Sequence, residues 1–569
     1  MENFKNEIIA VLQPLAQLTE TEVDQHLAVP PDHKLGDYSF PCFILSKIWK
    51  SSPQEISAVL SEKLAEKIDS GSWIKEVRSV GPYLNFFCNR EKLAEETLQG
   101  IFHNKEEYGF CEEGRGKNVV IDFSAPNIAK PFGIGHLRST VIGSSLYRLH
   151  EALGYNCVGL NHLGDWGTQF GKLMVAYRLW GSEDSIKKDP IAYLYELYVK
   201  FHKEAEEDPL LEEEGRKWFK KLEDGEEEAV HLWSNFRELS LREFNRIYKR
   251  LDITFDAEQG ESFYNEMLST TVDELTERRL TRESDGALIV DLEPFGMPPC
   301  LLRKKDGATL YATRDLCAAT YRFEKYQFHR LIYVVGAAQS LHFQQLFKVL
   351  ELMDFPWGQR CVHVPFGLIK FKEGKMSTRM GNLIFLEDVI DKAVELANQI
   401  IQEKNPDLKD KEQVAEIIGI GAIIFGDLSN DRIKDIDFDW DKVLDFGGET
   451  SPYIQYAHAR ICSILRKEKV AVSHEINFSL LQTEEEQNLI IGLARFSENI
   501  KKAAAIYKPS ILARYLIELT RDFNNFYHRC PVLTAEDGLR EARLLLIDGV
   551  RQVLVNGLYL LGIKAPSEM

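Results

Sequence analysis

Several features that mark common protein classes are missing from this chain of 569 residues. No Cys-x-x-Cys pair occurs, and the nine cysteines are scattered and odd in number, which argues against a zinc site or a disulfide framework. No stretch approaches the ~20 apolar residues of a membrane span. No internal repeat or low-complexity tract is present. A formal charge of −19 excludes a protein whose whole surface binds polyanions.

The composition that remains is that of a globular protein, with 44% hydrophobic and 28% charged residues. The first residues carry Glu2 and Glu7 and no long apolar run, so they predict a short amphipathic helix rather than a signal or transit peptide. Scattered thiols that stay reduced are typical of a reducing compartment such as the cytoplasm. We therefore expect a cytoplasmic protein with three or four domains, taking roughly 150 residues for each.

Residues 1–115 are predicted to form a small α/β module. Helical periodicity at 56–68 alternates with a strand-like run at 83–87, and a Gly-rich linker follows at 112–116. From there to 452 the pattern changes to short apolar runs separated by helical stretches, which predicts a Rossmann-type parallel sheet that binds ligands at the carboxyl ends of its strands. The predicted strands are 119–123, 157–160, 331–335 and 368–371. An acidic helical insertion is expected at about 175–250.

From about 400 onward the pattern is helical, and 453–569 is predicted to be an all-α domain. One helix face is formed by Leu489, Leu493, Phe496 and Ile500. Pro509 suits the first turn of the next helix, which carries apolar residues as far as Phe523. This last domain has 15 Lys and Arg against 13 Asp and Glu, a net charge of +2, so the rest of the chain carries −21. The acidity is therefore not evenly spread.

Two motifs carry chemistry. The first, SAPNIAKPFGIGHLRST at 124–140, follows a strand and leads into a helix near His136. Gly133 and Gly135 would let a nucleotide approach the backbone closely, although taken alone a tight strand-to-helix turn is the simpler explanation. The second, GKMSTRMGN at 374–382, is a cationic, hydroxyl-rich loop that suits a triphosphate, although alone a solvated loop is the simpler explanation.

Together, about 240 residues apart, the two motifs resemble the His-x-Gly-His and Lys-Met-Ser-Lys-Ser signatures of class I aminoacyl-tRNA synthetases. Further segments resemble the arginyl-tRNA synthetases and extend over essentially the whole chain. These are KLGDYSFPCFILSK, GPYLNFF, SAPNIAKPF, NHLGDWGTQFGKL, FDAEQGESFY, LYATRDLCAA, SPYIQYAHARICSILRK and NGLYLLGIKAPSEM.

The resemblance implies a two-step reaction in which arginine and ATP, with Mg²⁺, form arginyl-adenylate, and tRNA(Arg) then accepts the arginyl group on its 3′-terminal adenosine. Catalysis would come from positioning and charge stabilisation without a covalent nucleophile. Family members commonly need tRNA for the first step. The resemblance also implies a monomer without a membrane or DNA partner, in which the N-terminal module contacts the outer corner of the tRNA and 453–569 binds the anticodon.

By resemblance, His136, Lys130, Lys375 and Arg379 are the catalytic residues. The residues expected to contact ATP are Gly133, Gly135, His136, Lys375, Met376 and Ser377. The chain departs from the signatures twice, because Gly133 replaces the first histidine and Thr378 replaces the second lysine. A histidine at position 133 would donate a hydrogen bond to the α-phosphate region. Our hypothesis is that His136, Lys130 and Arg379 suffice without it.

Recognition of a guanidinium needs carboxylates and carbonyls in a fixed arrangement. Matching the family motifs assigns arginine binding to Asn127, Glu261, Tyr311, Asp315 and Gln339, although without that match Tyr311 and Asp315 would be an ordinary helical pair. The anticodon domain contains aromatic residues for base stacking and cations for phosphates. The residues expected to bind tRNA are Tyr453, Tyr456, Arg460, Arg466 and Tyr527, whereas core packing is expected for Phe526.

Three alternative functions fit the sequence less well. A cysteinyl or other class I synthetase would be expected to carry a zinc-binding Cys/His cluster, which the sequence lacks. A non-catalytic RNA-binding relative would have lost more of its site than the histidine at position 133. A nucleotidyltransferase of another kind would not explain the helical C-terminal domain. For the arginyl enzyme, the acidic background predicts a tRNA complex that weakens with salt.

Overall fold

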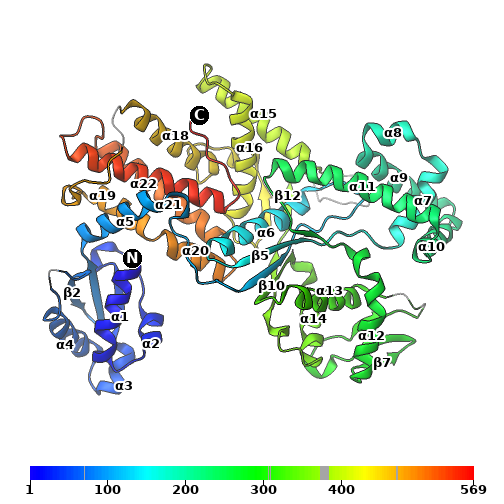
Figure 1. Cartoon of the computed structure of the whole chain (residues 1–569), viewed down its shortest axis with the longest axis horizontal. Helices are drawn as coiled ribbons and strands as arrows, with labels where there is room; N and C mark the ends of the chain where they lie inside the picture. Colours follow the sequence, from blue (N-terminus) through cyan, green and yellow to red (C-terminus); the bar gives the residue numbers. More distant parts are fainter. Residues whose placement is uncertain (70, 306, 308, 372–383, 469–471) are drawn as a thin grey trace. The chain divides into compact units, whose positions relative to one another are not determined.

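The computed structural model describes residues 1–69, 71–305, 307, 309–371, 384–468 and 472–569. The chain divides into two compact units (Figure 1). The first unit comprises Met1–Tyr108, Arg460–Glu498 and Glu518–Asn556. The second comprises Gly109–Ala459, Asn499–Ile517 and Gly557–Met569.

The N-terminal part of the first unit contains an antiparallel sheet in the order β1-β3-β2. Its strands are β1 (Tyr38–Pro41), β2 (Ile74–Val80) and β3 (Tyr83–Cys88). The last two form a hairpin, and its turn uses Gly81 at a φ of 57°, where glycine carries no steric penalty. The accompanying helices are α1 (Glu2–Ala16), α2 (Glu20–His26), α3 (Ser46–Trp49), α4 (Pro53–Ala65) and α5 (Arg90–Asn104). The predicted strand and helix of the N-terminal module correspond to β3 and α4.

A parallel sheet in the order β11-β10-β4-β5-β6 forms the centre of the second unit, which confirms the predicted Rossmann-type architecture. The assignment of 368–371 to this sheet is wrong, because that run pairs with Ile436–Phe438 in a separate sheet. Its strands are β4 (Asn118–Asp122), β5 (Asn156–Asn161), β6 (Ala257–Glu258), β10 (Arg330–Gly336) and β11 (Cys361–Phe366). Most residues of β4 and β10 are buried, as expected for central parallel strands covered on both faces. Helix α6 (Ile134–Ala152) connects β4 to β5.

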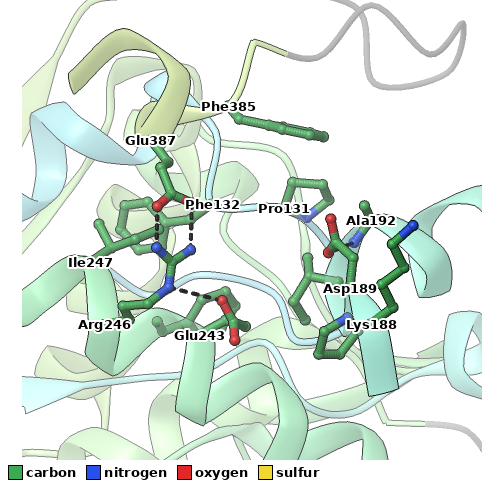
Figure 2. Close-up of a pocket in the computed structure, with 13 residues that line it drawn as sticks. Pro131, Phe132, Lys188, Asp189, Ala192, Glu243, Arg246, Ile247, Phe385 and Glu387 are labelled. Carbon is green, nitrogen blue, oxygen red and sulfur yellow. Dashed lines mark hydrogen bonds and ion pairs between the residues drawn. The ribbon is translucent and has the colours of Figure 1, made fainter. Parts of the chain in front are cut away.

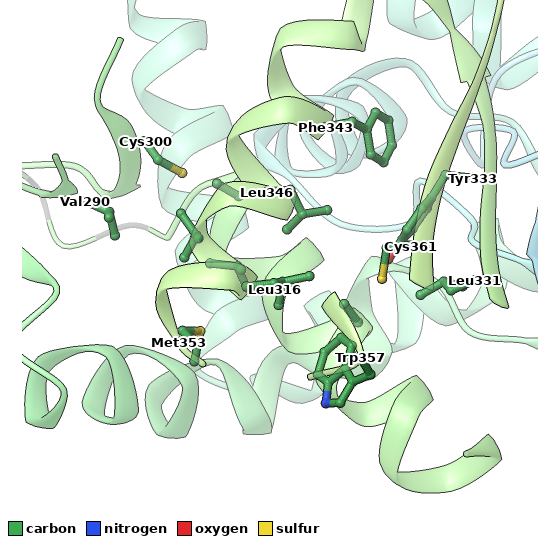
Figure 3. Packing of buried hydrophobic residues seen from close by; sticks show 14 of the residues in the cluster. Val290, Cys300, Leu316, Leu331, Tyr333, Phe343, Leu346, Met353, Trp357 and Cys361 are labelled. Atoms are coloured by element: carbon green, nitrogen blue, oxygen red, sulfur yellow. The ribbon is translucent and has the colours of Figure 1, made fainter. Parts of the chain in front are cut away.

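Two helices pack beside this sheet, of which the first carries Tyr311 and Asp315 and the second begins directly after Gln339. They are α13 (Tyr311–Tyr326) and α14 (Ser340–Leu352). Side chains from both helices join those of β10 in one buried cluster that includes Leu316, Leu346 and Leu331, all fully buried (Figure 3). Because this cluster is closely packed, the beginnings of α13 and α14 are held in a fixed relation to the carboxyl end of β10.

The stretch predicted as an acidic insertion is helical. It contains α7 (Thr168–Trp180), α8 (Glu183–Lys188), α9 (Pro190–Glu207), α10 (Leu210–Glu223) and α11 (Glu227–Arg250). Beyond it, α12 (Leu268–Glu277) precedes an antiparallel sheet, and a separate parallel pair lies further along the chain. The strands of the antiparallel sheet are β7 (Thr281–Ser284), β8 (Ala287–Val290) and β9 (Cys300–Arg303), and the pair is β12 (Ile369–Phe371) with β13 (Ile436–Phe438).

The remaining helices are α15 (Leu386–Lys404), α16 (Lys411–Leu428), α17 (Trp440–Val443), α18 (Ser451–Lys467), α19 (Glu484–Ala494), α20 (Phe496–Ala505), α21 (Ser510–Arg529) and α22 (Leu539–Leu560). Two expectations for this region need correction. The purely helical pattern after about 400 is interrupted by β13, which pairs with β12 far upstream. The helix face through Leu489 and Ile500 is divided between α19 and α20, because Arg495 bonds to Gly492 in a tight turn.

Candidate active site

The segment between β4 and α6 has an unusual backbone. Ser124, Ala125 and Ala129 take positive φ angles of 73°, 50° and 56°, which are uncommon for residues with a side chain and persist only where surrounding contacts hold them. The contacts come from three other elements. Ser139 Oγ accepts from the Ser124 amide at 2.9 Å, Asn161 Oδ1 from the Ala125 amide at 3.2 Å, and Ser240 Oγ from the Ala129 amide at 2.8 Å.

His136 lies in the first turn of α6 and is oriented by the turn itself. The Gly133 amide donates to Nδ1 of His136 at 3.2 Å, so the proton of the neutral ring is on Nε2, the nitrogen that remains for a ligand. Burial lowers the pKa of His136 to about 4, and the positive charge of Lys130 acts in the same direction. The imidazole is therefore neutral at physiological pH and presents a hydrogen-bond donor.

Lys130 supplies the positive charge beside this histidine. Its ammonium group lies 5.1 Å from the ring centroid of Tyr198 on α9, and burial lowers the pKa of Lys130. Gly133 adopts a φ of −81° and a ψ of 160°, which any residue can take. Gly135 is exposed, and a Cβ placed there would meet none of the described atoms within 4 Å. The room above the start of α6 is thus compatible with a phosphate group.

The predicted loop residues Lys375, Met376, Ser377 and Arg379 lie outside the described residues. The chain just after them is bonded directly to the turn before α6. The Ile134 amide donates to the Ile384 carbonyl at 3.1 Å, and the Leu386 amide donates to the Phe132 carbonyl at 2.9 Å. The turn of the first signature therefore forms a short antiparallel bridge, between Gly133 and Phe385, with the chain that follows the second signature.

A pocket of about 270 Å³ lies beside this bridge, as Figure 2 shows. Arg246 of α11 closes one side, with both terminal nitrogens on the Glu387 carboxylate and Nε 3.1 Å from Glu243. The hydrogen bonds from Arg246 hold the pKa of Glu387 below its ordinary value. Pro131 and Phe385 line the opposite part of the pocket. The insertion thus contacts both the turn and the beginning of α15.

The residues assigned to arginine gather at the carboxyl ends of the parallel strands. Tyr311 and Asp315 lie one turn apart on α13, and Glu261 begins the short 3₁₀ helix Glu261–Met267 after β6. Burial raises the pKa of Glu261 to about 7, the negative charges of Asp165 and Asp315 add to this effect, and Arg314 opposes it. Burial also raises the pKa of Tyr311, with Glu261 and Asp315 contributing. The Glu261 and Asp315 carboxyl groups and the Tyr311 hydroxyl therefore lie within electrostatic range of one another.

The other two assigned residues occupy neighbouring positions along the same edge. Asn127 forms a parallel bridge with Gly164 after β5, and a Cβ on Gly164 would lie 2.2 Å from the Asn127 carboxamide oxygen, so a larger residue there would displace the Asn127 side chain. Gln339 ends the 3₁₀ helix Ala337–Gln339 after β10 and is exposed. Since β4, β5 and β10 are adjacent in the sheet, their carboxyl ends converge.

Asp165 is a functional candidate that the sequence analysis missed. Its carboxylate is completely buried and accepts from the Ser262 amide and hydroxyl, both at 2.8 Å, and from Arg237 Nε at 3.2 Å. It therefore fixes the residue next to Glu261. The signal was present in the segment NHLGDWG, where an aspartate between two glycines follows a strand, but its partners lie more than 70 positions away.

The sequence analysis also missed a buried ion pair on α13, the helix that carries Tyr311 and Asp315. Asp122, the last residue of β4, pairs with Arg322 of α13 at 2.8 Å, and both side chains are almost fully buried. Arg322 also lies 3.3 Å from Nδ1 of His162, at the end of β5. This buried ion pair connects α13 to the sheet two turns after Asp315. Breaking such a pair strands an uncompensated charge, which is strongly destabilising.

The residues expected to bind tRNA fall into both units. Arg460, Arg466 and Tyr527 belong to the first unit, where the Arg460 guanidinium lies 4.9 Å from the Tyr527 ring centroid and donates to Asn524 at 3.0 Å. Tyr527 is 40% exposed. Phe526 is completely buried, which confirms its assignment to the core. Tyr453 and Tyr456, both on α18, belong to the second unit.

The described residues contain no metal-binding cluster of side chains and no membrane-spanning helix. No group of three or more His, Cys, Asp or Glu among them could hold a metal ion, and all nine cysteines are free thiols. No helix among them is long and apolar enough to cross a membrane.

Three family models match the chain. They are the class I (R) tRNA synthetase catalytic domain over residues 97–440, the DALR anticodon binding domain over 454–569, and the arginyl-tRNA synthetase N-terminal domain over 2–88. Among curated relatives, the arginine–tRNA ligases of Halothermothrix orenii and Clostridioides difficile are 47% and 46% identical, each over all of both chains. Among solved structures, the arginyl-tRNA synthetase of Thermus thermophilus has a TM-score of 0.84 at 27% identity, covering 99% of this chain and all of its own. That of Plasmodium falciparum has a TM-score of 0.82 at 26% identity, covering 100% and 99%.

Proposed function

The chain belongs to the arginyl-tRNA synthetase family and is an arginine–tRNA ligase, and on that premise we propose how its residues divide the reaction. In the first step, the arginine carboxylate attacks the α-phosphorus of ATP, which gives arginyl-adenylate and releases pyrophosphate. In the second, a hydroxyl of the 3′-terminal adenosine of tRNA(Arg) takes the arginyl group and AMP leaves. Both steps take place at the carboxyl ends of β4, β5 and β10.

At the ATP end, His136 donates from Nε2 to a phosphate oxygen while Lys130 offsets the negative charge. The donor orientation set by the Gly133 amide supports this assignment, because a neutral imidazole donates at every physiological pH. Lys375, Met376, Ser377 and Arg379 complete the phosphate contacts in the proposal. Fixed donors of this kind stabilise charge that develops in the transition state without reorganisation.

At the amino acid end, Asp315 and Tyr311 bind the guanidinium, and Glu261 binds the α-ammonium group with Asn127 and Gln339 beside it. The observation that carries the proposal is that Tyr311 and Asp315, one turn apart on α13, lie within electrostatic range of Glu261, which begins the 3₁₀ helix after β6. Two carboxylates in a partly buried location suit a substrate with two cationic groups, since an unpaired buried charge is costly.

Magnesium enters this proposal as the companion of ATP. The side chains beside the turn are a histidine and a lysine, which do not suit an ion that prefers carboxylate and water oxygens. The ATP phosphates would therefore hold Mg²⁺, which would neutralise part of their charge when bound.

For the tRNA, we propose that residues 453–569 bind the anticodon. In this proposal Tyr527 stacks on an unpaired base and Arg460 contacts a phosphate. Tyr453, Tyr456 and Arg466 contribute further contacts. Residues 1–115 would contact the outer corner of the tRNA, and 116–452 would hold the reaction. A cytoplasmic monomer is the expected form. Light scattering of the purified chain, with and without tRNA, measures the oligomeric state directly.

The deciding experiment is aminoacylation of total tRNA with each of the twenty amino acids, accompanied by ATP–pyrophosphate exchange with and without tRNA. The expected outcome is charging with arginine alone and exchange that requires tRNA(Arg). Strong exchange without tRNA would contradict the proposed order of events, and charging with another amino acid would contradict the proposed arginine site.

A further inference from the structure

His342, in the first turn of α14, contacts the carboxylate assigned to the guanidinium. Its Nε2 lies 2.6 Å from Oδ2 of Asp315, and the two side chains are 22% and 24% exposed. An ionised carboxylate can only accept, so the histidine donates. The bond is made to Oδ2, and His342 does not engage Oδ1.

The imidazole that makes this contact is itself held by packing. The ring of Phe343 meets it edge-on at 5.4 Å, and Phe343 also stacks on His363 of β11 at 4.4 Å. His363 Nε2 donates to the Val335 carbonyl at 3.0 Å, so it serves the backbone of β10 instead of Asp315. Both histidines therefore pack on Phe343, but of the two it is His342 that contacts Asp315.

We propose that His342 is a positioning residue for arginine recognition, which fixes the plane of the Asp315 carboxylate so that a guanidinium can bind in a fork. This inference rests on the proposed function of Asp315. A planar guanidinium forms two parallel hydrogen bonds only when the carboxylate plane matches its own. A carboxylate without such a donor can rotate about its last bond. A donor on Oδ2 removes that freedom before the substrate arrives.

Preorganisation of this kind has a specific kinetic consequence. Loss of the donor leaves Asp315 in place and charged, but each binding event must then order its carboxylate. Arginine affinity falls, while ATP, which does not touch Asp315, keeps its affinity. A purely structural contact between α13 and α14 would instead lower stability and affect both substrates alike.

Glutamine is a close replacement for this histidine, because its side-chain nitrogen lies the same number of bonds from Cβ as Nε2 does. The test compares His342→Gln, His342→Ala and the matched control His363→Gln by arginine KM, ATP KM and melting temperature. We expect His342→Ala to raise the arginine KM about tenfold, as for a lost charge-assisted hydrogen bond, with ATP KM unchanged. His342→Gln should recover most of the loss, and His363→Gln should leave both KM values at wild-type level.

A double-mutant cycle with Asp315→Asn isolates the coupling. If His342 acts through Asp315, His342→Ala should have little further effect on arginine KM once Asp315 is changed. Equal, additive losses in both backgrounds would overturn the inference, as would equal impairment of the Gln and Ala variants at position 342. An unchanged arginine KM in Asp315→Asn alone would instead refute the proposed arginine site, so the two failures are distinguishable.

Discussion

Arginine binding should depend on pH because of Glu261. In the free protein, burial raises the pKa of this carboxyl to about 7, and the charges of Asp165 and Asp315 contribute. A raised pKa means that the neutral acid predominates below pH 7 and the carboxylate above it. The α-ammonium group of arginine prefers the carboxylate. Affinity for arginine should therefore rise with pH through 7 and level off near pH 8.

The size of the effect follows from the ionised fraction. With a pKa of about 7, roughly one tenth of Glu261 is ionised at pH 6 and nine tenths at pH 8, and apparent affinity scales with the competent fraction. The expected change is about ninefold over this window. His136 adds nothing to it, because a pKa of about 4 leaves that ring neutral throughout. Binding at pH 7 should also release about half a proton.

Isothermal titration calorimetry of arginine at pH 6, 7 and 8 measures both quantities, with the proton release taken from two buffers of different ionisation enthalpy. Glu261→Gln should bind more weakly and lose the pH dependence, whereas Glu261→Asp should keep a slope of the same sign. A wild-type affinity that falls with rising pH, or a full ninefold slope that survives in Glu261→Gln, would refute the assignment of the titrating group.

Three further substitutions test other parts of the site. Gly133→His should raise the rate of ATP–pyrophosphate exchange modestly by adding a donor to phosphate, and a wild type that is inactive until this change is made would refute the sufficiency of His136, Lys130 and Arg379. Asp315→Asn should raise arginine KM roughly 100-fold and ATP KM little, as for loss of a charged, forked hydrogen bond; equal losses for both substrates would count against the assignment. Arg322→Met should destabilise the second unit by about 3–5 kcal/mol in urea unfolding by stranding a buried carboxylate; the exposed control Arg282→Met should cost no more than about 1 kcal/mol, and equal effects would disprove the role of burial.

The parts of the fold that sequence analysis predicted are those with a local signal. The apolar runs that became β4, β5 and β10 are long enough to be recognised because central parallel strands are covered on both faces. The break between α19 and α20 at Arg495 was not predicted. The tight turn there keeps the apolar positions buried, so it leaves the helical periodicity of the sequence intact. The strand β13 is three residues long, and its pairing with β12 depends on a partner 67 positions away.

In the candidate site, too, the sequence predicted residues that have a local pattern and missed the contacts between distant segments. The described residues assigned to ATP and arginine lie near strand ends or in the first two turns of helices, where the local pattern is informative. The contacts that hold them come from distant segments: Asp165 from Arg237 and Ser262, and Asp315 from His342, 27 positions away. No periodicity relates such pairs, because they are created only when the sheet forms. The assignments on Lys375 and Arg379 stay predictions.

The glycine at position 133 can affect the site through its backbone or through the side chain that it lacks. The Gly133 amide orients His136 and its neighbours bridge to the chain after the second signature, and both interactions use backbone atoms that any residue possesses. Its φ and ψ are those of an extended residue, so glycine is not there for conformational freedom. Whatever a histidine contributes at this position is therefore confined to its ring. In the proposed mode of ATP binding that ring would add one hydrogen bond to phosphate, which is why we expect a modest gain in rate from Gly133→His.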